Sequence, residues 1–309
     1  MGSPGRKRTI VTSGFGTVDV VTGSTVRAFP GGTAINVAMA LESLGWSTMF
    51  AGTVGNDPAG RFMRDQLDSA GVGTSALRLE SAWTTPVILQ ESKGGDHDWR
   101  FSCPVCGAKF AKHRPAPEEI AIKLAERLDA PDVFFFDRAT LFTVRLALEW
   151  SSRGTFVVFE PAGLGRPHLF DRSVAIADLI KYSAERGVGF MDRVPVGPAF
   201  IVETLGSAGA RFRLPKRSAW HERPPYQTDG LVDTAGAGDW TSAGILDALI
   251  PDERTAKPFT LQQARIAIDA GQRLGAKSCS WQGVHPGGLR NIQESSFESF
   301  GCPRFLSTQ

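Results

Sequence analysis

A run of small residues stands directly before an aspartate in the segment DTAGAGD, which ends at Asp239. Glycine and alanine leave backbone N–H groups uncovered, and the apolar residues that follow, from 240 to 250, recur at helical spacing. Gly236, Ala237 and Gly238 are therefore expected at a helix N-terminus, where free N–H groups and the helix dipole favour an anion. Asp239 would lie beside whatever carries that anion, as a catalytic base does in phosphoryl transfer. This segment alone leaves open a simpler interpretation, in which Asp239 only caps a helix after a turn.

Gly238 carries a specific expectation. If the loop holds a phosphoryl group, small side chains are needed because the anion must approach the backbone closely. A valine at this position would resist a positive φ and fill the space of the phosphate oxygens, so we expect it to block catalysis.

A second group of polar residues follows the first strand-like run, TIVTSGF. Gly31 and Gly32 would let a ligand approach backbone N–H groups, and Asn36 offers a donor and an acceptor on one side chain. Asp19 stands where a carboxylate could accept hydrogen bonds from two neighbouring hydroxyls. Open α/β sheets bind ligands at their strand ends, so these residues predict a site for a hydroxyl-bearing ligand. Taken singly, each also fits a turn glycine, a capping asparagine or a surface aspartate.

These segments sit among strand-like and helix-like runs that alternate along the chain, for example STMFAGTVG followed by PAGRFMRDQLDSAG. Alternation of this kind predicts an α/β fold with a mostly parallel central sheet covered by helices on both faces. The interval from Leu77 to Phe101 differs, because short runs there are separated by the polar turn KGGDHD. It predicts an antiparallel hairpin inserted between α/β units, with 113–119 as the return linker.

Composition limits the class of protein. The chain has 309 residues, is 42% hydrophobic, and carries a net charge of +2 from 34 basic and 32 acidic residues. It can bury a large core, and it has no basic run of the kind that binds nucleic acid or an anionic membrane. No run approaches the roughly 18 apolar residues of a membrane span, the first residues lack an apolar signal-peptide core, and the four cysteines are irregularly spaced. We therefore expect a cytoplasmic protein with a small-molecule partner.

Taken in order, the motifs resemble the ribokinase-like, or PfkB-type, family of sugar and nucleoside kinases. The resemblance covers almost the whole chain, from Gly14 and Asp19 through GGTAINVAMALESLG and FAGTVGNDPAGRFMRDQLDSAGV to TLGSAGA and DTAGAGD. The two signature stretches are long, which makes them far more specific than a lone glycine motif. The resemblance implies a single ribokinase-like α/β domain over residues 1–309, in three layers, with a small β lid inserted at about 77–112. It also implies an ATP-dependent kinase that transfers the γ-phosphate to a hydroxyl of a small polyol.

The resemblance implies a role for each motif. Asp239 would take the proton from the acceptor hydroxyl as that hydroxyl attacks the γ-phosphate of ATP. The anion hole for the transferred group would consist of Gly236, Ala237 and Gly238. The acceptor hydroxyls would bind to Asp19, Gly31, Gly32 and Asn36. The ATP site would include Thr204, Gly206, Gly209, Lys181 and Ser183. Trp240, directly after the base, stands where members of the family more often have a small residue.

The chain departs from the family where metal ions are organised. Members commonly have an Asn-x-x-Glu stretch that organises Mg2+ and the phosphates, whereas this chain has Ser183 and Arg186 at those positions. Glu185, one residue out of register, could substitute through a water, or it could be a helix-surface glutamate. Arg186 could instead contact a phosphate directly as a fixed positive charge. Asp233 stands where many members place a carboxylate near a K+ site.

The motif CPVCG belongs to none of these groups. Cys103 and Cys106 form half of a zinc-ribbon pattern, and His97 and His113 flank them. Structural zinc is normally tetrahedral, so the cysteines and histidines together could just complete a site. Because the chain has no second C-x-x-C, we favour a reduced pair in the lid or beside the acceptor over a zinc site.

Several functions stay open at this stage. A sugar is the expected acceptor, with a nucleoside as the runner-up; Arg100 and Arg138 are candidates for an acidic or phosphorylated acceptor, or they are surface arginines. Many members of the family form a homodimer through the lid that covers the acceptor, so we expect both features here. A catalytically weak nucleotide or sugar sensor is suggested by Ser183 and Arg186, and a zinc-stapled assembly protein by CPVCG. Asp239 argues against both, because a protein that only binds has no need of a base.

Overall fold

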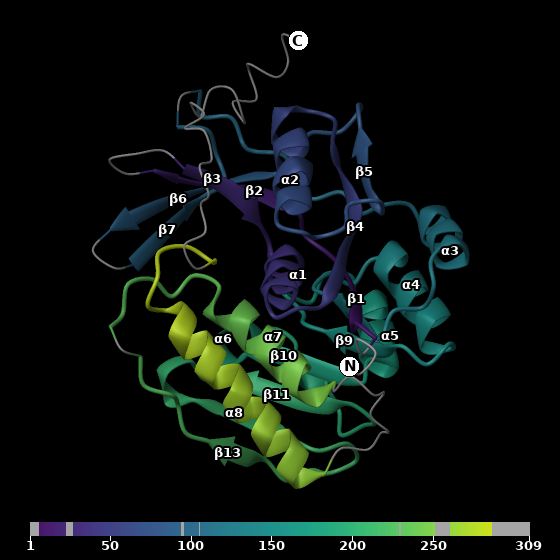
Figure 1. Ribbon diagram of the computed structural model, residues 1–309, viewed down its shortest axis with the longest axis vertical. Helices are drawn as coiled ribbons and strands as arrows, with labels where there is room; N and C mark the ends of the chain where they lie inside the picture. The colour runs from purple at the N-terminus through teal and green to yellow at the C-terminus, as the bar shows by residue number, and fades with distance from the viewer. Residues whose placement is uncertain are drawn as a thin grey trace, which may run out of the picture.

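A nine-stranded sheet forms the centre of the molecule. The computed structural model describes residues 6–22, 27–93, 96–104, 106–228, 230–250 and 260–285, and Figure 1 labels their helices and strands. In sheet order, the strands are β13 (His221–Arg223), β12 (Ala210–Arg213), β11 (Phe200–Thr204), β10 (Leu179–Ser183), β9 (Phe156–Phe159), β8 (Val133–Phe136), β1 (Thr9–Ser13), β4 (Ser47–Gly55) and β5 (Leu77–Glu80). All neighbours from β11 to β5 pair in parallel, whereas β12 pairs antiparallel with both β11 and β13. The expected mostly parallel sheet is confirmed.

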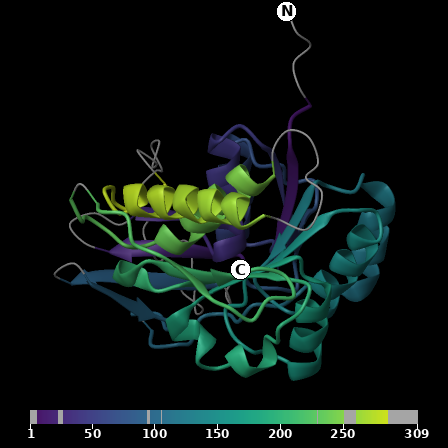
Figure 2. The same ribbon diagram turned by 90° about the horizontal axis from the view of Figure 1, so that it is seen from below.

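Helices cover both faces of this sheet, as Figure 2 shows from below. One face carries α1 (Thr33–Ser43), α2 (Pro58–Ser69), α7 (Ala237–Leu249) and α8 (Leu261–Ser278). The other face carries α3 (Glu118–Arg127), α4 (Leu141–Ser151) and α5 (Pro167–Ile176). A short helix, α6 (Ala184–Gly187), directly follows β10. These layers confirm the expected α/β arrangement in three layers, and none of the helices in the described ranges is long and apolar enough to cross a bilayer.

Local sequence explains where these elements form. β8 reads VFFF because both of its faces are buried: Phe134 and Phe136 enter one core and Phe135 enters the other. α2 begins where the Asp57 side chain accepts a hydrogen bond from the Gly60 amide, with proline at the first helical position. The cap and the proline together set the residue at which α2 begins.

A second sheet, which we call the lid, stands beside the main body on the left of Figure 1. Its strands, in order, are β3 (Arg27–Gly31), β2 (Thr17–Thr22), β6 (Val87–Lys93) and β7 (Asp96–Arg100). The hairpins β2–β3 and β6–β7 are antiparallel, and β2 joins β6 in parallel. The inserted hairpin expected from the turn KGGDHD is therefore present as β6 and β7.

The extent of the lid differs from the expected segment at about 77–112. Leu77–Glu80 is β5, which pairs in parallel with β4 at the edge of the main sheet. The lid also takes half of its strands from Thr17–Gly31, where Asp19 is opposite Ile88. The sequence could not show this, because a strand joins a sheet through partners that are remote in the chain, and both sheets use the same strand-like patterns.

Candidate active site

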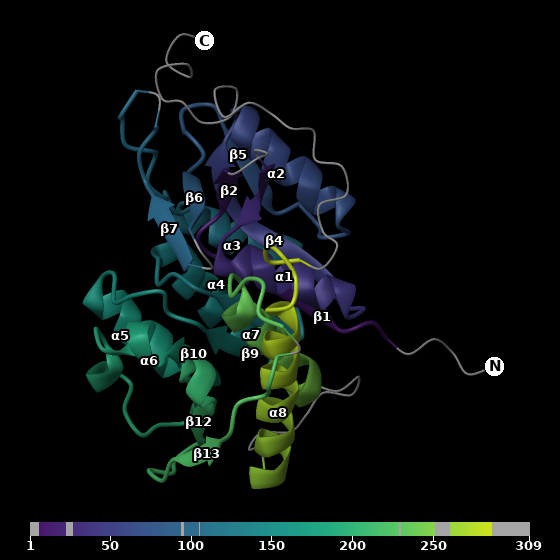
Figure 3. The ribbon, with the colours of Figure 1, turned by 90° about the vertical axis from the view of Figure 1, so that its left-hand side faces the viewer.

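A cavity of about 740 Å³ lies between the lid and the carboxyl ends of the main-sheet strands. Parallel pairing brings those ends to one edge, where Glu160 follows β9, Lys181 is on β10, and Ser183 is opposite Thr204. In Figure 3 the strands β6 and β7 lie above α6 and the start of α7, and all four elements contribute residues to the cavity lining. The edge at which open α/β sheets bind ligands is thus also the edge that the lid covers.

Asp239 lies in the first turn of α7 and lines this cavity. The side-chain amide of Asn36, on α1, donates a hydrogen bond of 2.6 Å to Asp239 Oδ2. Removal from water and the charge of Glu160 raise the pKa of Asp239 to about 7, although the Asn36 hydrogen bond and the charges of Lys181 and Arg186 act to lower it. A carboxyl group with this pKa can exchange a proton near neutral pH.

Asp19, on β2 of the lid, lines the same cavity and is only 6% exposed. Burial and the charge of Asp239 raise the pKa of Asp19 to about 7. Asp19 Oδ1 and Asn36 Oδ1 have no hydrogen-bond partner within the described part of the chain. Two buried, unpartnered acceptor atoms that face one cavity are suited to bind the hydroxyl groups of a ligand.

The two glycines between Asp19 and Asn36 have different reasons to be glycine. A Cβ at Gly31 would lie 2.2 Å from Asp19 Oδ2, so this position is small in order to admit the carboxylate, and it does not itself line the cavity. Gly32 lines the cavity with a φ of 103°, and a Cβ there would lie 1.9 Å from the Phe15 carbonyl oxygen. Gly31 therefore acts through Asp19, whereas Gly32 is open to a ligand.

The start of α7 differs in detail from the expected anion loop. The positive φ belongs to Gly236, at 79°, while Gly238 lies in helical backbone, so the expected left-handed conformation at Gly238 is wrong. The Ala237 amide donates to the Thr234 carbonyl at 3.2 Å, whereas the amides of Gly238 and Asp239 have no acceptor among the described residues. The first amides of a helix are free by construction. Within the described ranges, the donors available to an anion are therefore the amides of Gly236, Gly238 and Asp239, because the Gly236 amide has no acceptor either.

Glu160 is a cavity residue that the sequence did not single out. Lys181 Nζ donates to Glu160 Oε1 at 2.7 Å and to the Gly238 carbonyl at 2.8 Å, and the Ser242 hydroxyl donates to Glu160 Oε2. The Lys181 side chain is 2% exposed. Lys181, expected in the ATP site, is thus the buried partner of Glu160, and together they fasten the start of α7 to β9 and β10.

Asp137 is the second cavity residue that sequence reasoning missed. It follows β8, is buried, and accepts hydrogen bonds from the amides of Phe15 at 3.0 Å and Ala34 at 3.4 Å. Burial raises the pKa of Asp137, opposed by the charge of Arg138 and by these two amides. A Cβ at Gly14 would lie 1.9 Å from Asp137 Oδ1. An aspartate directly after the buried run VFFF was the available signal.

The residues expected to bind ATP divide into two groups. Ser183 lines the cavity, and its hydroxyl accepts a hydrogen bond of 3.3 Å from the Arg186 amide at the start of α6. Thr204 is its neighbour across β10 and β11. Gly206 and Gly209 form the turn between β11 and β12 with φ values of 59° and 98°, and they do not line the cavity. These two glycines therefore have a local reason for their identity, the turn itself.

Asp233 lies outside the cavity lining and is buried. Its carboxylate accepts hydrogen bonds from the amides of Ala235 at 2.8 Å and Gly283 at 3.0 Å. Asp233 thus holds the loop before α7 against residues 281–285. Trp240 also holds the start of α7 against residues 281–285. Its indole N–H donates to the Val284 carbonyl at 2.6 Å, and its ring packs edge-on against Trp281. This contact explains the large side chain at position 240.

The described residues contain no cluster of three or more histidine, cysteine, aspartate or glutamate side chains arranged to hold a metal ion. Cys103 and Cys106 form no disulfide bond within the described part of the chain. The His113 ring packs against Phe15 with ring centres 5.7 Å apart, and the side chain of His97 lies outside the described residues. This geometry gives the zinc hypothesis no support beyond the sequence pattern.

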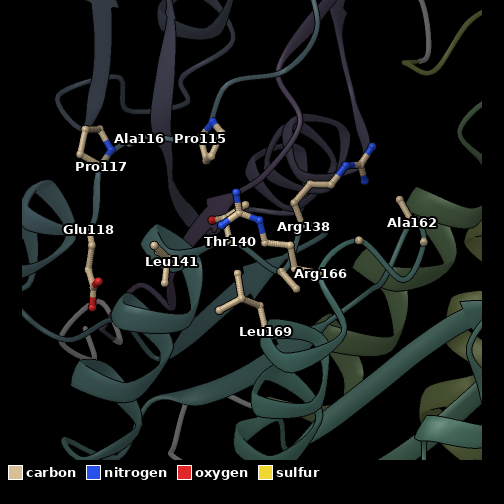
Figure 4. A pocket seen from close by; sticks show the side chains of 13 residues that line it. Pro115, Ala116, Pro117, Glu118, Arg138, Thr140, Leu141, Ala162, Arg166 and Leu169 are labelled. Carbon is tan, nitrogen blue, oxygen red and sulfur yellow. The ribbon is translucent and has the colours of Figure 1, made fainter.

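A second hollow of about 630 Å³ adjoins the cavity and shares Arg138 and Ala162 with it. Figure 4 shows it, with the prolines at 115 and 117 on one side and Leu169 on the other. The Arg138 guanidinium lies over the Phe15 ring, 5.2 Å from its centre. Arg138, a candidate for binding an acidic acceptor, thus stands at the wall between the two spaces.

Comparisons with known proteins agree with this geometry. Residues 6–116 match the family model described as pfkB family carbohydrate kinase. A fructokinase of Klebsiella pneumoniae is 30% identical over 252 residues, which cover 74% of this chain and 80% of that protein. An ATP-dependent ribose-1-phosphate kinase of Halopiger xanaduensis is 28% identical over 263 residues, covering 80% of this chain and 82% of the relative.

Solved structures show the same fold. Aminoimidazole riboside kinase from Salmonella enterica, complexed with aminoimidazole riboside and an ATP analog, matches with a TM-score of 0.67 at 21% identity, over 97% of this chain and 99% of that one. A fructokinase from Vibrio cholerae with bound fructose, ADP and calcium ion also gives a TM-score of 0.67 at 21% identity, over 90% of this chain and 94% of that one.

Proposed function

Because this chain belongs to the pfkB family of carbohydrate kinases, we propose that it transfers the γ-phosphate of ATP to a hydroxyl of a small sugar-like acceptor. The chain is a phosphotransferase with an alcohol group as acceptor. One observation carries the finer proposal: Asp239, held by Asn36, faces the cavity in the same helical turn as the free amides of Gly238 and Asp239.

Asp239 acts as the general base. An acceptor hydroxyl in the cavity passes its proton to the Asp239 carboxylate while its oxygen attacks the γ-phosphorus; the bond from that phosphorus to the β–γ bridging oxygen breaks, and ADP leaves. The pKa of Asp239, raised to about 7 by removal from water and by Glu160, is close to the pH at which a base is both deprotonated and strong enough to take a proton. Asn36 is a positioning residue for this base as well as a ligand for the acceptor.

The acceptor is held from the lid side. The unpartnered Oδ1 atoms of Asp19 and Asn36 accept hydrogen bonds from its hydroxyl groups, so that one hydroxyl points to Asp239. The amides of Gly238 and Asp239 donate to the transferred phosphoryl oxygens, where negative charge builds up in the transition state. One such donor is typically worth about 3–4 kcal/mol to the transition state.

Magnesium normally enters a kinase site with the nucleotide, coordinated by phosphates and by one or two carboxylates. The carboxylates that line this cavity offer a poor set. Glu160 is bonded through both oxygens to Lys181 and Ser242, and Asp137 is bonded to two amides. Glu185 is the exposed carboxylate at the cavity within the described ranges, and no cluster surrounds it. The described residues thus offer no preformed group of three or more ligands that would hold a magnesium ion without the nucleotide, and K+ near Asp233 stays a prediction.

A nucleoside is the second candidate acceptor. The hollow that shares Arg138 and Ala162 with the cavity offers room for a ring attached to the sugar. Relatives of this chain include proteins named as fructokinases, an aminoimidazole riboside kinase and a nucleoside kinase.

Acceptor-dependent ADP formation tests the proposal. The purified chain is assayed with ATP and a panel that contains fructose, ribose, glucose, adenosine and inosine, each against an acceptor-free control. We expect one member of the panel to raise ADP formation well above the acceptor-free rate, with one phosphorylated product per ADP. ATP binding without any acceptor-dependent turnover would instead favour the sensor.

A further inference from the structure

The positively charged side chains that line the cavity differ in whether they have a carboxylate partner. The carboxylates that line it are Asp19, Asp137, Glu160, Glu185 and Asp239, and the cations are Arg138, Lys181 and Arg186. Lys181 is committed to Glu160, and Arg138 lies 3.6 Å from Asp137 with its guanidinium over Phe15. Arg186 forms no ion pair and no side-chain hydrogen bond with another described residue. It is therefore the cation that remains available to a ligand.

The position of Arg186 is fixed by its short helix. The Ser183 hydroxyl accepts a hydrogen bond from the Arg186 amide. Ser183 thereby caps α6 at the end of β10. The next residue, Gly187, is packed so closely that a Cβ there would lie 2.8 Å from the Tyr182 ring. Arg186 itself is exposed and lines the cavity together with Gly238 and Asp239. A guanidinium thus stands at the cavity together with the residues of α7 whose amides are free.

A polyphosphate brought into this cavity meets mostly negative side chains. Charge of the same sign repels it, and the described residues contain no preformed group of three or more ligands for a metal ion that could offset the repulsion. A guanidinium can offset this repulsion without a metal ion, because it is positively charged and its planar fork donates two parallel hydrogen bonds to phosphate oxygens. The charge of Arg186 already acts on Asp239, whose pKa it lowers.

We propose that Arg186 binds the terminal phosphates of ATP directly, so that nucleotide binding depends on this guanidinium rather than on a divalent cation held by the protein. This inference rests on the proposed kinase function. It predicts that the chain binds ATP in the absence of magnesium.

Calorimetry with three ligands tests the inference: Mg·ATP, ATP in excess EDTA, and adenosine. The variants are Arg186→Gln, Arg186→Lys, and Arg172→Gln as a control on an exposed arginine of α5 that does not line the cavity. We expect Arg186→Gln to weaken the binding of metal-free ATP by about 10- to 100-fold, the usual effect of losing a hydrogen bond to a charged group. Arg186→Lys should lose less, adenosine affinity should not change, and Arg172→Gln should match the wild type.

The outcomes separate this inference from the kinase proposal. Wild-type chain that binds ATP only when magnesium is present overturns the inference, as does an Arg186→Gln variant that binds metal-free ATP within about twofold of wild type. An equal loss of adenosine and ATP affinity overturns it too, because that loss points to a misfolded site. Wild-type chain that binds no ATP with or without magnesium contradicts the kinase proposal itself.

Discussion

Asp19, on a strand of the lid, and Asp239, in the first turn of α7, line the same cavity, and each is expected to titrate near neutral pH. Burial is the main cause for both, and the charge of Asp239 adds to the shift of Asp19. Two interacting carboxyl groups lose their protons as a pair, so the observed pKa values belong to the site rather than to one residue. This arrangement keeps a proton acceptor available at pH 7 without a histidine.

The pH dependence of turnover follows from the direction of these shifts. A base with a raised pKa is deprotonated only above it, so kcat should fall by about tenfold for each pH unit below about 7. The Asn36 hydrogen bond lowers the pKa of Asp239, so Asn36→Ala should move the acid limb of the kcat profile to higher pH. The check is a profile from pH 5 to 9 for both proteins, and turnover that is flat down to pH 5 would exclude Asp239 as the titrating base.

The sequence identified functional residues that stand in recognisable motifs. It did not identify residues whose role depends on a partner that is remote in the chain. Asp239, Asn36 and Asp19 stand in motifs from which a functional role could be predicted. In the structure all three line the same cavity. Glu160 was missed because its importance comes from Lys181 on the next strand, a pairing that only the sheet creates. For the same reason the ion pair of Lys181 was not predicted, and its expected part in ATP binding stays a prediction.

At the scale of elements, β9, β10 and α7 meet through the pair of Lys181 and Glu160. Lys181→Met would leave the Glu160 carboxylate buried and unpaired, which typically costs about 3–5 kcal/mol. We expect a clear fall in the urea midpoint of unfolding for this variant, and partial recovery in the double variant Lys181→Met/Glu160→Gln. A single variant as stable as wild type would show that the pair does not hold these elements together.

The loop before α7 makes a second prediction, in which two glycines serve as each other's control. Gly236→Ala forces a φ of 79° on a residue with a side chain and places Cβ 2.5 Å from Val284 Cγ1. It should cost about 1–3 kcal/mol in stability and lower kcat with it. Gly238→Ala should fold like wild type, since the nearest atom to its Cβ is Lys181 Nζ at 3.7 Å. Equal melting temperatures for Gly236→Ala and wild type would contradict this account of the loop.

At the scale of the whole molecule, the alternation of strands and helices predicted the parallel sheet and its two covered faces. The boundary of the lid was not predicted, because Thr17–Thr22 follows β1 directly and looks like part of the main sheet. It leaves that sheet by pairing with Val87–Lys93. The homodimer through the lid stays a prediction; β3 and β7 are the edge strands at which another copy could pair.

The lid should also limit the access of water to the cavity. Phe101 follows β7, lines the cavity and is 62% exposed, as expected of a side chain that is covered only when the acceptor is bound. Phe101→Ala should raise the acceptor KM by about tenfold, or about 1.4 kcal/mol, and increase the share of ATP that is hydrolysed without transfer. Val188→Ala, at an exposed apolar position that does not line the cavity, is the control. An unchanged ratio of hydrolysis to transfer would show that Phe101 has no part in closure.

The central claim is that Asp239 is the base, and Asp239→Asn tests it most directly. Asparagine keeps the shape of the side chain but cannot take the proton from the acceptor. With the best acceptor of the panel, we expect kcat to fall by about 10²- to 10⁴-fold while the affinity for ATP, measured by calorimetry, stays within about twofold of wild type. An Asp239→Asn variant that keeps more than about a tenth of wild-type kcat would contradict the account.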